Sequence, residues 1–340
     1  MTAAPLVAEA AEAILQAVGV TKRIPLHGRD RGRAVHALNG VDLTLRRGQI
    51  LALVGESGSG KSTLARLLAL GDTPTDGEIR FAGKQVRPGR RADRRAHFGR
   101  VQMVLQDPFS SLNNLHRVRY ILSRPLRNFG RTSPAEIEGR ILELLERVNL
   151  TPATDFIDKF PHELSGGQRQ RIAIARALAA EPVVLLGDEP VSMLDVSIRL
   201  DILNLLAELR DRDGLAMLYI THDIASARYF ADEISVMYAG HIVESGPAEQ
   251  VTQEPKHPYT KLLLAASPNP DRLTVGTEAE DVDVDVDEKD LAEPPNLLAE
   301  PVGCPFAHRC PDAAPVCSAT APPTHSFAAG QLARCWLYDS

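Results

Sequence analysis

The chain has 340 residues, of which 44% are hydrophobic and 24% are charged, and its formal net charge is −6. This length allows one large domain with an appendage or two domains, and the composition is ordinary for a globular protein with a sizeable core. The negative charge argues against a global basic field for nucleic acid, so no nucleic-acid partner is expected. No uninterrupted apolar run reaches the roughly 18–20 residues of a membrane span.

The two ends of the chain carry further information. Residues 1–12 are rich in alanine and are expected to form a short helical lead-in, and the absence of a basic region argues against a signal peptide. All four cysteines lie between Cys304 and Cys335. The rest of the chain has none, which is typical of a reducing compartment.

The first predicted elements are short strands. Residues 13–18 and 41–45 are expected to be edge strands, joined by a basic loop over residues 21–33. The apolar run 50–54 predicts a buried strand, and 78–81 a further short strand.

The sequence GESGSGKST follows the buried strand and precedes a predicted helix, which is the context that the P-loop pattern G-x-x-x-x-G-K-[ST] requires. Its glycines let backbone N–H groups surround phosphates. Lys61 is expected to reach the β- and γ-phosphates, and Ser62 offers a hydroxyl to Mg²⁺. The candidate nucleotide-binding residues are Gly55, Glu56, Ser57, Gly58, Ser59, Gly60, Lys61, Ser62 and Thr63.

An arginine-rich segment and a helical insert come next. Residues 87–100 have the arginine content of a nucleic-acid patch, but a solvated loop fits the net negative charge of the chain better. Residues 101–105 predict a strand that ends at Gln106. Helical periodicity dominates residues 134–148. A mostly helical insert is therefore expected over about 113–180, between strands of the sheet.

The stretch 162–195 combines a helix start, a strand and two carboxylates. The Ser-Gly-Gly sequence at 165–167 opens a helix, where free N–H groups and the positive end of the helix dipole favour an anion. The apolar run 183–186 is suited to a central parallel strand. Asp188 and Glu189 then stand at its carboxyl end, where open α/β sheets bind ligands. This arrangement indicates phosphate chemistry.

The remaining segments alternate again and then change in composition. An acidic, proline-rich run at 266–301 cannot bury enough apolar surface to fold alone, so it is expected to be a flexible linker. The elements predicted before it are a helix at 198–210, a strand at 215–220 followed by His222, a hairpin formed by 234–237 and 241–244, and a helix at 248–265.

These motifs occur in one order: the P-loop, Gln106, LSGGQ at 164–168, VVLLGDE at 183–189, SMLD at 192–195 and His222. The order resembles that in the nucleotide-binding subunit of an ATP-binding cassette (ABC) transporter. The resemblance implies an α/β P-loop NTPase cassette over residues 1–265, with a RecA-like core, an antiparallel β subdomain and a helical subdomain. A small cysteine-containing extension at 302–340 would follow the linker.

The resemblance also implies roles for individual residues. Asp188 would hold Mg²⁺, mostly through water, together with Ser62 and Gln106. Glu189 would polarise the attacking water, and His222 would contact the γ-phosphate, so Glu189, His222 and Gln106 form the candidate catalytic set. Gln106 would in addition report to the membrane partner. The implied cofactors are ATP and Mg²⁺.

A second group of residues would act on the ATP of a partner cassette across a head-to-tail dimer. This signature group consists of Leu164, Ser165, Gly166, Gly167 and Gln168. The adjacent D-loop would contribute Ser192 and Asp195.

Four segments further resemble cassettes of the oligopeptide/dipeptide importer type: QDPFSSLN, EPVSMLDVSIR, HPYTKLLLAASP and GCPFAHRC. Such prokaryotic importers pair two similar cassettes as a heterodimer under two transmembrane permease subunits, fed by an extracellular solute-binding protein. The chain would then lie peripherally on the cytoplasmic face of the cell membrane. Oligosaccharide or nickel are alternative solutes. A soluble ATP-switched clamp in translation or DNA repair is the alternative function.

The chain departs from the family at one place and is ambiguous at another. Residues 21–24 lack the aromatic that usually stacks on adenine, and Arg23 could supply its guanidinium plane instead. The terminal cysteines suit an iron–sulfur cluster or zinc, although no Cys-x2-Cys knuckle occurs. Resemblance to related extensions favours a [4Fe–4S] cluster over Zn²⁺, with free thiols or a disulfide also open. The four candidate ligands are Cys304, Cys310, Cys317 and Cys335.

Overall fold

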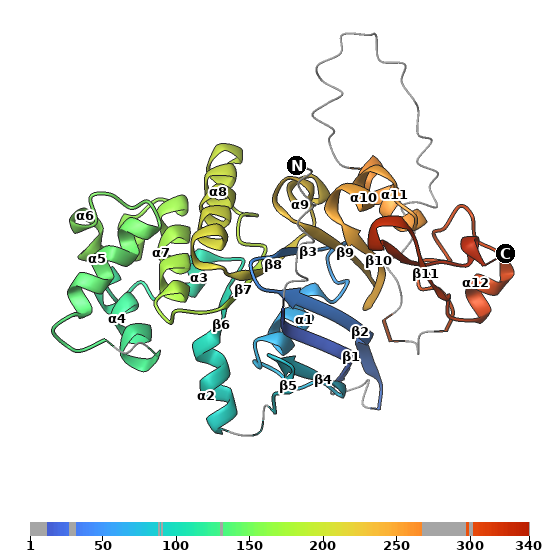
Figure 1. Cartoon of the computed structure of the whole chain (residues 1–340), viewed down its shortest axis with the longest axis horizontal. Coiled ribbons are helices and arrows are strands. Elements are labelled where there is room, and N and C mark those ends of the chain that lie inside the picture. The colour runs from blue at the N-terminus through green and yellow to red at the C-terminus, as the bar shows by residue number, and fades with distance from the viewer. Residues whose placement is uncertain are drawn as a thin grey trace, which may run out of the picture.

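A computed structural model describes residues 12–26, 32–87, 89, 91–129, 132–266, 297–298 and 302–339. The predicted lead-in (1–12) and linker (266–301) therefore lie almost wholly outside the described residues. Two sheets organise the remainder, one mixed and one antiparallel (Figure 1).

The larger sheet has the strand order β11-β12-β10-β9-β3-β8-β7-β6. Pairing is parallel from β9 to β6 and antiparallel beyond β9. Its strands are β3 (Ile50–Val54), β6 (Val101–Val104), β7 (Val184–Asp188), β8 (Ala216–Thr221), β9 (Glu233–Tyr238), β10 (His241–Pro247), β11 (Thr324–Ser326) and β12 (Leu332–Arg334).

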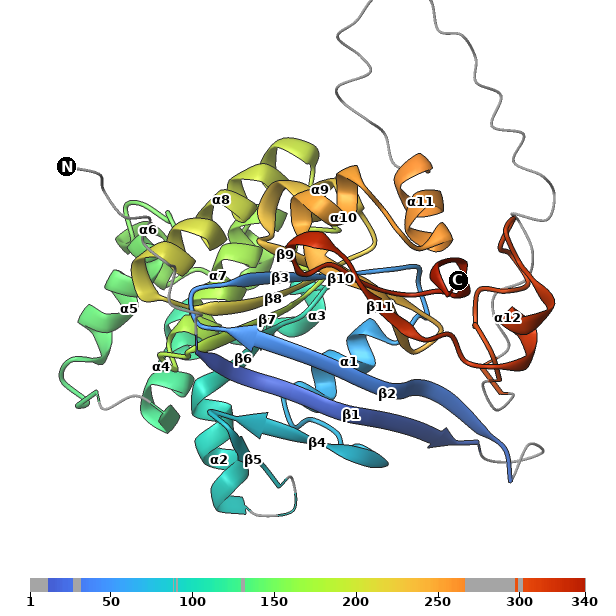
Figure 2. The same cartoon turned by 45° about the vertical axis from the view of Figure 1, so that its right-hand side comes forward.

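Strand β3 is apolar throughout because both faces of the sheet are covered. Leu51 and Leu53 belong to the core shared with α1, whereas Ala52 and Val54 belong to the core shared with α8. This split follows from the alternation of side chains along a strand. In Figure 2, α1 lies between the two sheets and α8, α9 and α10 cover the opposite face. The helices are α1 (Lys61–Leu68), α8 (Val196–Asp213), α9 (Ile224–Phe230) and α10 (Ala248–Gln253).

The antiparallel sheet has the order β2-β1-β4-β5 and corrects one prediction. The expected basic loop over 21–33 is shorter, because β1 continues to Pro25 and β2 begins at Ala34. The two strands pair through their backbones, for example Arg23 with His36, so the polar residues that were expected in the loop are part of the sheet up to Pro25. Its strands are β1 (Ala13–Pro25), β2 (Ala34–Arg46), β4 (Asp76–Phe81) and β5 (Lys84–Gln85).

The helical insert confirms the expected periodicity. The apolar face of α5 packs against the rest of the insert through the buried residues Ile141 and Leu145.

The prediction of a solvated loop over 87–100 is wrong at its C-terminal part, which forms helix α2. His97 of this helix is buried and bonds to the carbonyl of Leu68. The helices are α2 (Arg91–Arg100), α3 (Pro108–Ser111), α4 (Val118–Phe129), α5 (Ile137–Arg147), α6 (Thr154–Ile157) and α7 (Gly166–Leu178).

The C-terminal extension continues the larger sheet through the hairpin of β11 and β12. Strand β12 pairs with β10, and the buried carboxylate of Glu244 on β10 fixes this junction. It accepts hydrogen bonds from Gln331 Nε2 at 2.7 Å and from the backbone N–H of His257 at 2.8 Å. The extension also contains a short helix, α12 (Pro315–Ala319). The cysteine region is thus joined to the cassette by backbone pairing and a buried polar network.

The single helix predicted over 248–265 is two helices, α10 and α11 (Pro258–Ala265). His257 lies at the break and caps α11, since its Nδ1 accepts the backbone N–H of Tyr259 at 3.1 Å. The imidazole is 1% exposed, and burial lowers its pKa to about 4, helped by the charge of Lys261. The neutral ring is therefore the form that the fold requires.

This buried histidine predicts a loss of stability in acid. In the unfolded chain this histidine takes up a proton near pH 6.5, whereas folded His257 stays neutral down to about pH 4. The contribution of His257 to the free energy of unfolding is therefore fully present above pH 6.5 and is lost as the pH falls from 6.5 to 4. For this one group the loss between pH 7.5 and 5 is on the order of 2 kcal/mol. Urea unfolding at both pH values should show a smaller loss in His257→Asn, which keeps a capping acceptor without titrating. An equal loss in both proteins would contradict this assignment.

None of the helices in the described part of the chain has the length and apolar character needed to cross a membrane.

Candidate active site

The P-loop connects β3 to α1 and depends on glycine at two positions. A Cβ on Gly55 would collide with the carbonyl of Met237, and a Cβ on Gly60 would collide with the carbonyl of Ala37. Gly60 also has a φ of 108°, in the left-handed region that glycine tolerates. The loop therefore packs directly on the backbone of the sheet and of β2.

Lys61 lies at the centre of the loop and is only 5% exposed. Its Nζ donates to the carbonyls of Gly55 at 2.7 Å and Glu56 at 2.8 Å. Burial lowers the pKa of Lys61, while the carboxylates of Glu189 and Asp188 act in the opposite direction. The site thus holds a cation whose bonds to carbonyl oxygens can be exchanged for bonds to phosphate oxygens.

Ser62 and Asp188 provide two oxygen ligands side by side. Ser62 Oγ donates to Asp188 Oδ1 at 2.8 Å, and burial raises the pKa of Asp188 although this hydrogen bond opposes the shift. Mg²⁺ in nucleotide sites binds through one or two protein oxygens and completes its shell with water and phosphate. These two residues fit such an ion. Gln106, the third predicted ligand, contacts Glu189 instead.

Glu189 stands between the two other predicted catalytic residues. Gln106 Nε2 donates to Glu189 Oε2 at 2.9 Å, and His222 Nδ1 lies 3.3 Å from Glu189 Oε1. The reason is the strand order, since β7 lies between β6, which leads to Gln106, and β8, which leads to His222. Glu189 itself has a φ of 48°, an unusual value for a residue other than glycine. Three predicted residues therefore meet at the carboxyl end of β7, on the same edge of the sheet as the P-loop.

The signature group begins α7 and packs against the chain's own α8. Ser165 and Gln168 form a reciprocal capping box, with N–H to oxygen distances of 3.0 and 3.3 Å. A Cβ on Gly167 would lie 2.7 Å from Ile198 Cγ2, so this glycine serves packing within the chain. Leu164 is buried whereas Ser165 is exposed.

The D-loop links this region to Glu189. Ser192 Oγ donates to the carbonyl of Glu189 at 3.1 Å. Asp195 occupies the N-cap position of α8 without a side-chain capping bond.

The expected place for adenine stacking is on strand β1 rather than in a loop. Ile24 is 41% exposed there and pairs with Val35, while the backbone N–H of Arg23 donates to Thr75 Oγ1 at 3.0 Å. The base-contacting role of Arg23 stays a prediction.

Sequence reasoning missed two residues that contact the P-loop from outside the cassette motifs. Tyr259 Oη accepts the backbone N–H of Glu56 at 2.9 Å, and Arg309 Nη1 lies 2.9 Å from Glu56 Oε2. Both residues belong to segments whose sequence indicates only the importer type, HPYTKLLLAASP and GCPFAHRC. A carboxylate inside a phosphate-binding loop was the available signal, because it calls for a cation nearby.

The four cysteines are free thiols in the extension, and the backbone N–H of Cys304 donates to the carbonyl of Cys317 at 2.6 Å. Burial raises the pKa of Cys304 and Cys335, and raises that of Cys310 to about 11. Across the described ranges, no three Cys, His, Asp or Glu side chains are grouped so as to hold a metal ion. The predicted [4Fe–4S] cluster, like Zn²⁺, gains no support from this arrangement.

Comparison with known proteins decides the family. Residues 38–192 match the family model described as ABC transporter, and 243–317 match that of the oligopeptide/dipeptide transporter, C-terminal region. The chain is 39% identical to the dipeptide transport ATP-binding protein DppF of Haemophilus influenzae, over 96% of this chain and 97% of the relative. It is 40% identical to the di/tripeptide transport protein DppF of Pseudomonas aeruginosa, over 92% of this chain and 94% of the relative. The chain belongs to the ABC transporter family.

Solved structures agree with this assignment. The ABC cassette MJ0796, described as a dimer in a post-hydrolysis state bound to ADP and Pi, matches with a TM-score of 0.62 and 29% identity over 69% of this chain and 99% of the other. The cbiO1 cassette of Clostridium perfringens gives the same TM-score at 30% identity, over 72% of this chain and 92% of the other. This ABC subunit is therefore an ATPase of the P-loop class, with the cassette fold that its motifs predict.

Proposed function

We propose that this ABC subunit hydrolyses ATP to drive the uptake of short peptides across the cytoplasmic membrane. The supporting observation is the match to dipeptide and oligopeptide transport proteins over more than nine-tenths of the chain, together with the matching C-terminal region. The same relatives favour peptides over oligosaccharides or nickel. They also favour a transporter subunit over a soluble clamp in translation or DNA repair.

The test is ATP-dependent uptake into proteoliposomes that contain the complete importer. A labelled dipeptide should accumulate with ATP and not with ADP, and the binding protein should be required. Accumulation of a nickel salt or an oligosaccharide in place of the dipeptide would contradict the proposed solute.

In the proposed reaction Lys61 and the P-loop amides bind the triphosphate, and Ser62 and Asp188 hold Mg²⁺, which neutralises phosphate charge when bound. Glu189 accepts the proton of the attacking water. Its contacts with Gln106 and His222 support this role, because they orient the carboxylate from the ends of β6 and β8, the two strands that flank β7.

We assign the signature group to the ATP of a second, similar cassette in a head-to-tail dimer. Ser165 is exposed at the start of α7, so its surface is available to a partner. Met193 in the D-loop and Val196 directly after it are 58% and 73% exposed, and this neighbouring apolar pair suits burial under a partner cassette. A heterodimer with a related cassette is the expected form.

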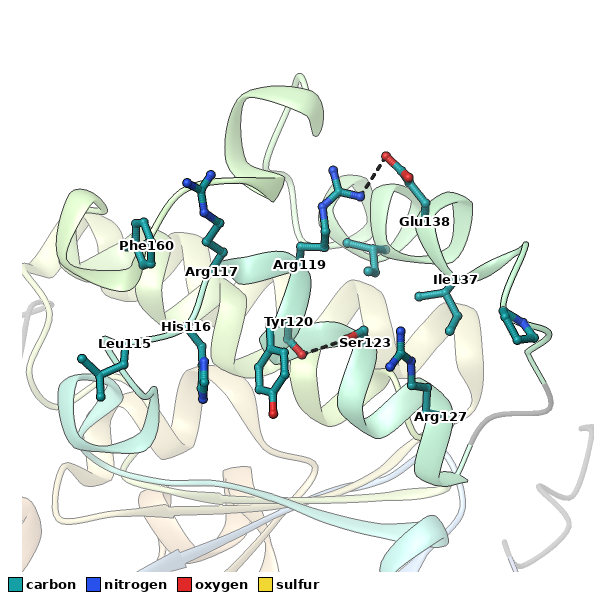
Figure 3. Close-up of a pocket in the computed structure, with 12 residues that line it drawn as sticks. Leu115, His116, Arg117, Arg119, Tyr120, Ser123, Arg127, Ile137, Glu138 and Phe160 are labelled. Atoms are coloured by element: carbon teal, nitrogen blue, oxygen red, sulfur yellow. Dashed lines mark hydrogen bonds and ion pairs between the residues drawn. The ribbon is translucent and has the colours of Figure 1, made fainter.

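We place the permease contact on the surface that follows Gln106. Four apolar side chains are exposed between residues 105 and 120, the most open being Leu115 at 83%. Figure 3 shows a groove beside Leu115, with Tyr120, Arg117 and Arg119 along it. An acidic or apolar cytoplasmic segment of a permease subunit suits this lining. The four apolar residues are Leu105, Phe109, Leu115 and Tyr120.

Leu115→Asp should weaken the attachment of this chain to the permease subunits. Because the side chain is 83% exposed, the stability of the chain should change by no more than about 0.5 kcal/mol. Placing a charge in the centre of an interface should reduce co-purification with the permease subunits roughly tenfold. Leu337→Asp, an exposed leucine of the extension, is the matched control and should not change recovery. Normal recovery of the permease with Leu115→Asp would move the docking surface elsewhere.

A further inference from the structure

Glu56 introduces an electrostatic problem into the P-loop. The loop is built to receive a triphosphate, yet the carboxylate of Glu56 lies within it, close enough to Lys61 to influence the pKa of that lysine. A negative charge beside a polyanion weakens binding unless a cation offsets it. Lys61 cannot serve both charges, since its ammonium faces the loop interior and bonds to backbone carbonyls.

Arg309 supplies the missing cation from the C-terminal extension. Its Nη1 lies 2.9 Å from Glu56 Oε2, and the guanidinium side chain is 9% exposed. The guanidinium also lies over the rings of Tyr238 and Phe306, at 5.9 and 5.8 Å from their centroids. Aromatic faces hold the cation in place and exclude water, which strengthens its attraction to the carboxylate.

The same extension-side surface fixes the backbone of Glu56. The N–H of Glu56 donates to Tyr259 Oη at 2.9 Å, and the ring of Tyr259 is fully buried. That ring packs against Tyr238 and Phe306, with centroid distances of 4.6 and 5.4 Å. One aromatic cluster therefore supports both the guanidinium and the phenolic hydroxyl that contact Glu56.

The extension can act in this way because it is anchored to the cassette independently of the P-loop. Strand β12 continues the central sheet, and Gln331 bonds to the buried carboxylate of Glu244 at 2.7 Å. Arg309 therefore approaches Glu56 from a rigid support. Figure 2 shows the extension (red) beside β9, β10 and α11; β9 supplies Tyr238 and α11 supplies Tyr259.

We propose that Arg309 is a positioning residue of the nucleotide site: it neutralises Glu56 so that the P-loop accepts the phosphates of ATP, and it makes the C-terminal extension part of that site. Tyr259 completes this contact by fixing the backbone of Glu56. The extension thus contributes to ATP affinity and not to the chemical step.

The test measures ATP affinity of the full-length chain by calorimetry with Mg²⁺ present. Arg309→Gln should weaken binding roughly fivefold to tenfold, because it leaves Glu56 uncompensated. Adding Glu56→Gln to this variant should restore affinity to near the original value, because the uncompensated carboxylate is then replaced by a neutral amide. The loss should also shrink at high salt, because the uncompensated carboxylate of Glu56, whose side chain is 37% exposed, is then screened. A purely structural role for Arg309 predicts the opposite, with the double variant as weak as the single one or weaker.

Three further variants make the result decisive. Arg309→Lys keeps the charge and should retain most of the affinity. Arg334→Gln, on β12 of the same extension, is the matched control, because within the described residues no ion pair joins it to the P-loop. If Arg309→Gln fails to fold, Glu56→Gln alone carries the test, and its affinity should equal or exceed that of the unaltered chain. A fall in affinity with Glu56→Gln, or unchanged affinity with folded Arg309→Gln, would overturn the proposal. The readout is binding, so failure here would leave the proposed peptide transport untouched.

Discussion

Replacing Glu189 with glutamine should reduce ATP hydrolysis by about 10²–10⁴-fold, the range that a well-placed general base contributes. The amide cannot take the proton of the attacking water, yet it is nearly the same size and can still bond to Gln106. ATP binding should therefore be retained. The measurement is phosphate release by the assembled importer, alongside ATP affinity of the same preparation.

The same variant tests the two-cassette arrangement. With hydrolysis blocked, ATP should trap a cassette dimer with the permease subunits attached, and the chain alone should be a poor ATPase. Glu249→Gln on α10, whose carboxylate bonds to Gln253 on the same helix, is the matched control. Recovery of monomer alone in ATP, or hydrolysis within tenfold of normal, would count against Glu189 as the base.

Lys61→Met should have the second large effect, this time on binding as well as rate. Lys61 is a buried cation whose charge is balanced against the carboxylates of Asp188 and Glu189, so its removal leaves these carboxylates uncompensated where the phosphates bind. Loss of one donor aimed at developing charge typically costs about 10²–10³ in kcat. ATP affinity should fall as well, which separates this variant from Glu189→Gln.

The control for Lys61→Met is Lys84→Met, because Lys84 lies exposed on the short edge strand β5. That change should alter neither kcat nor ATP affinity. If Lys61→Met bound ATP normally, the phosphate-binding role of the loop would have to be reassigned.

The sequence located the candidate site because its motifs follow predicted strands. Carboxyl ends of parallel strands meet at one edge of a sheet, so Gln106, Glu189 and His222 were expected near the P-loop. The structure adds that β7 lies between β6 and β8, which places Glu189 between the other two. Strand order is a property of the folded sheet, and no periodicity within a single strand encodes it.

The predictions of local elements were wrong where tertiary contacts override the local composition. The arginines of 91–100 suggested a solvated loop, but burial of His97 and its bond to Leu68 support a helix there. The basic segment after residue 20 was expected to be a loop, but pairing with β2 extends the strand to Pro25. Gly167 was expected to act on the ATP of a partner cassette, and the structure shows in addition that it packs against Ile198 of the same chain.

By itself, then, the sequence determined the family, the P-loop and the catalytic candidates, since these depend on short motifs whose chemistry and spacing are local. Only the tertiary structure joined Arg309 and Tyr259 to Glu56, because the two side chains reach the loop from 253 and 203 residues away. Such contacts arise from docking the β11–β12 hairpin on the sheet and from packing one aromatic cluster. The charge of Glu56 is visible in the sequence, but the cation that offsets it is found only in the fold.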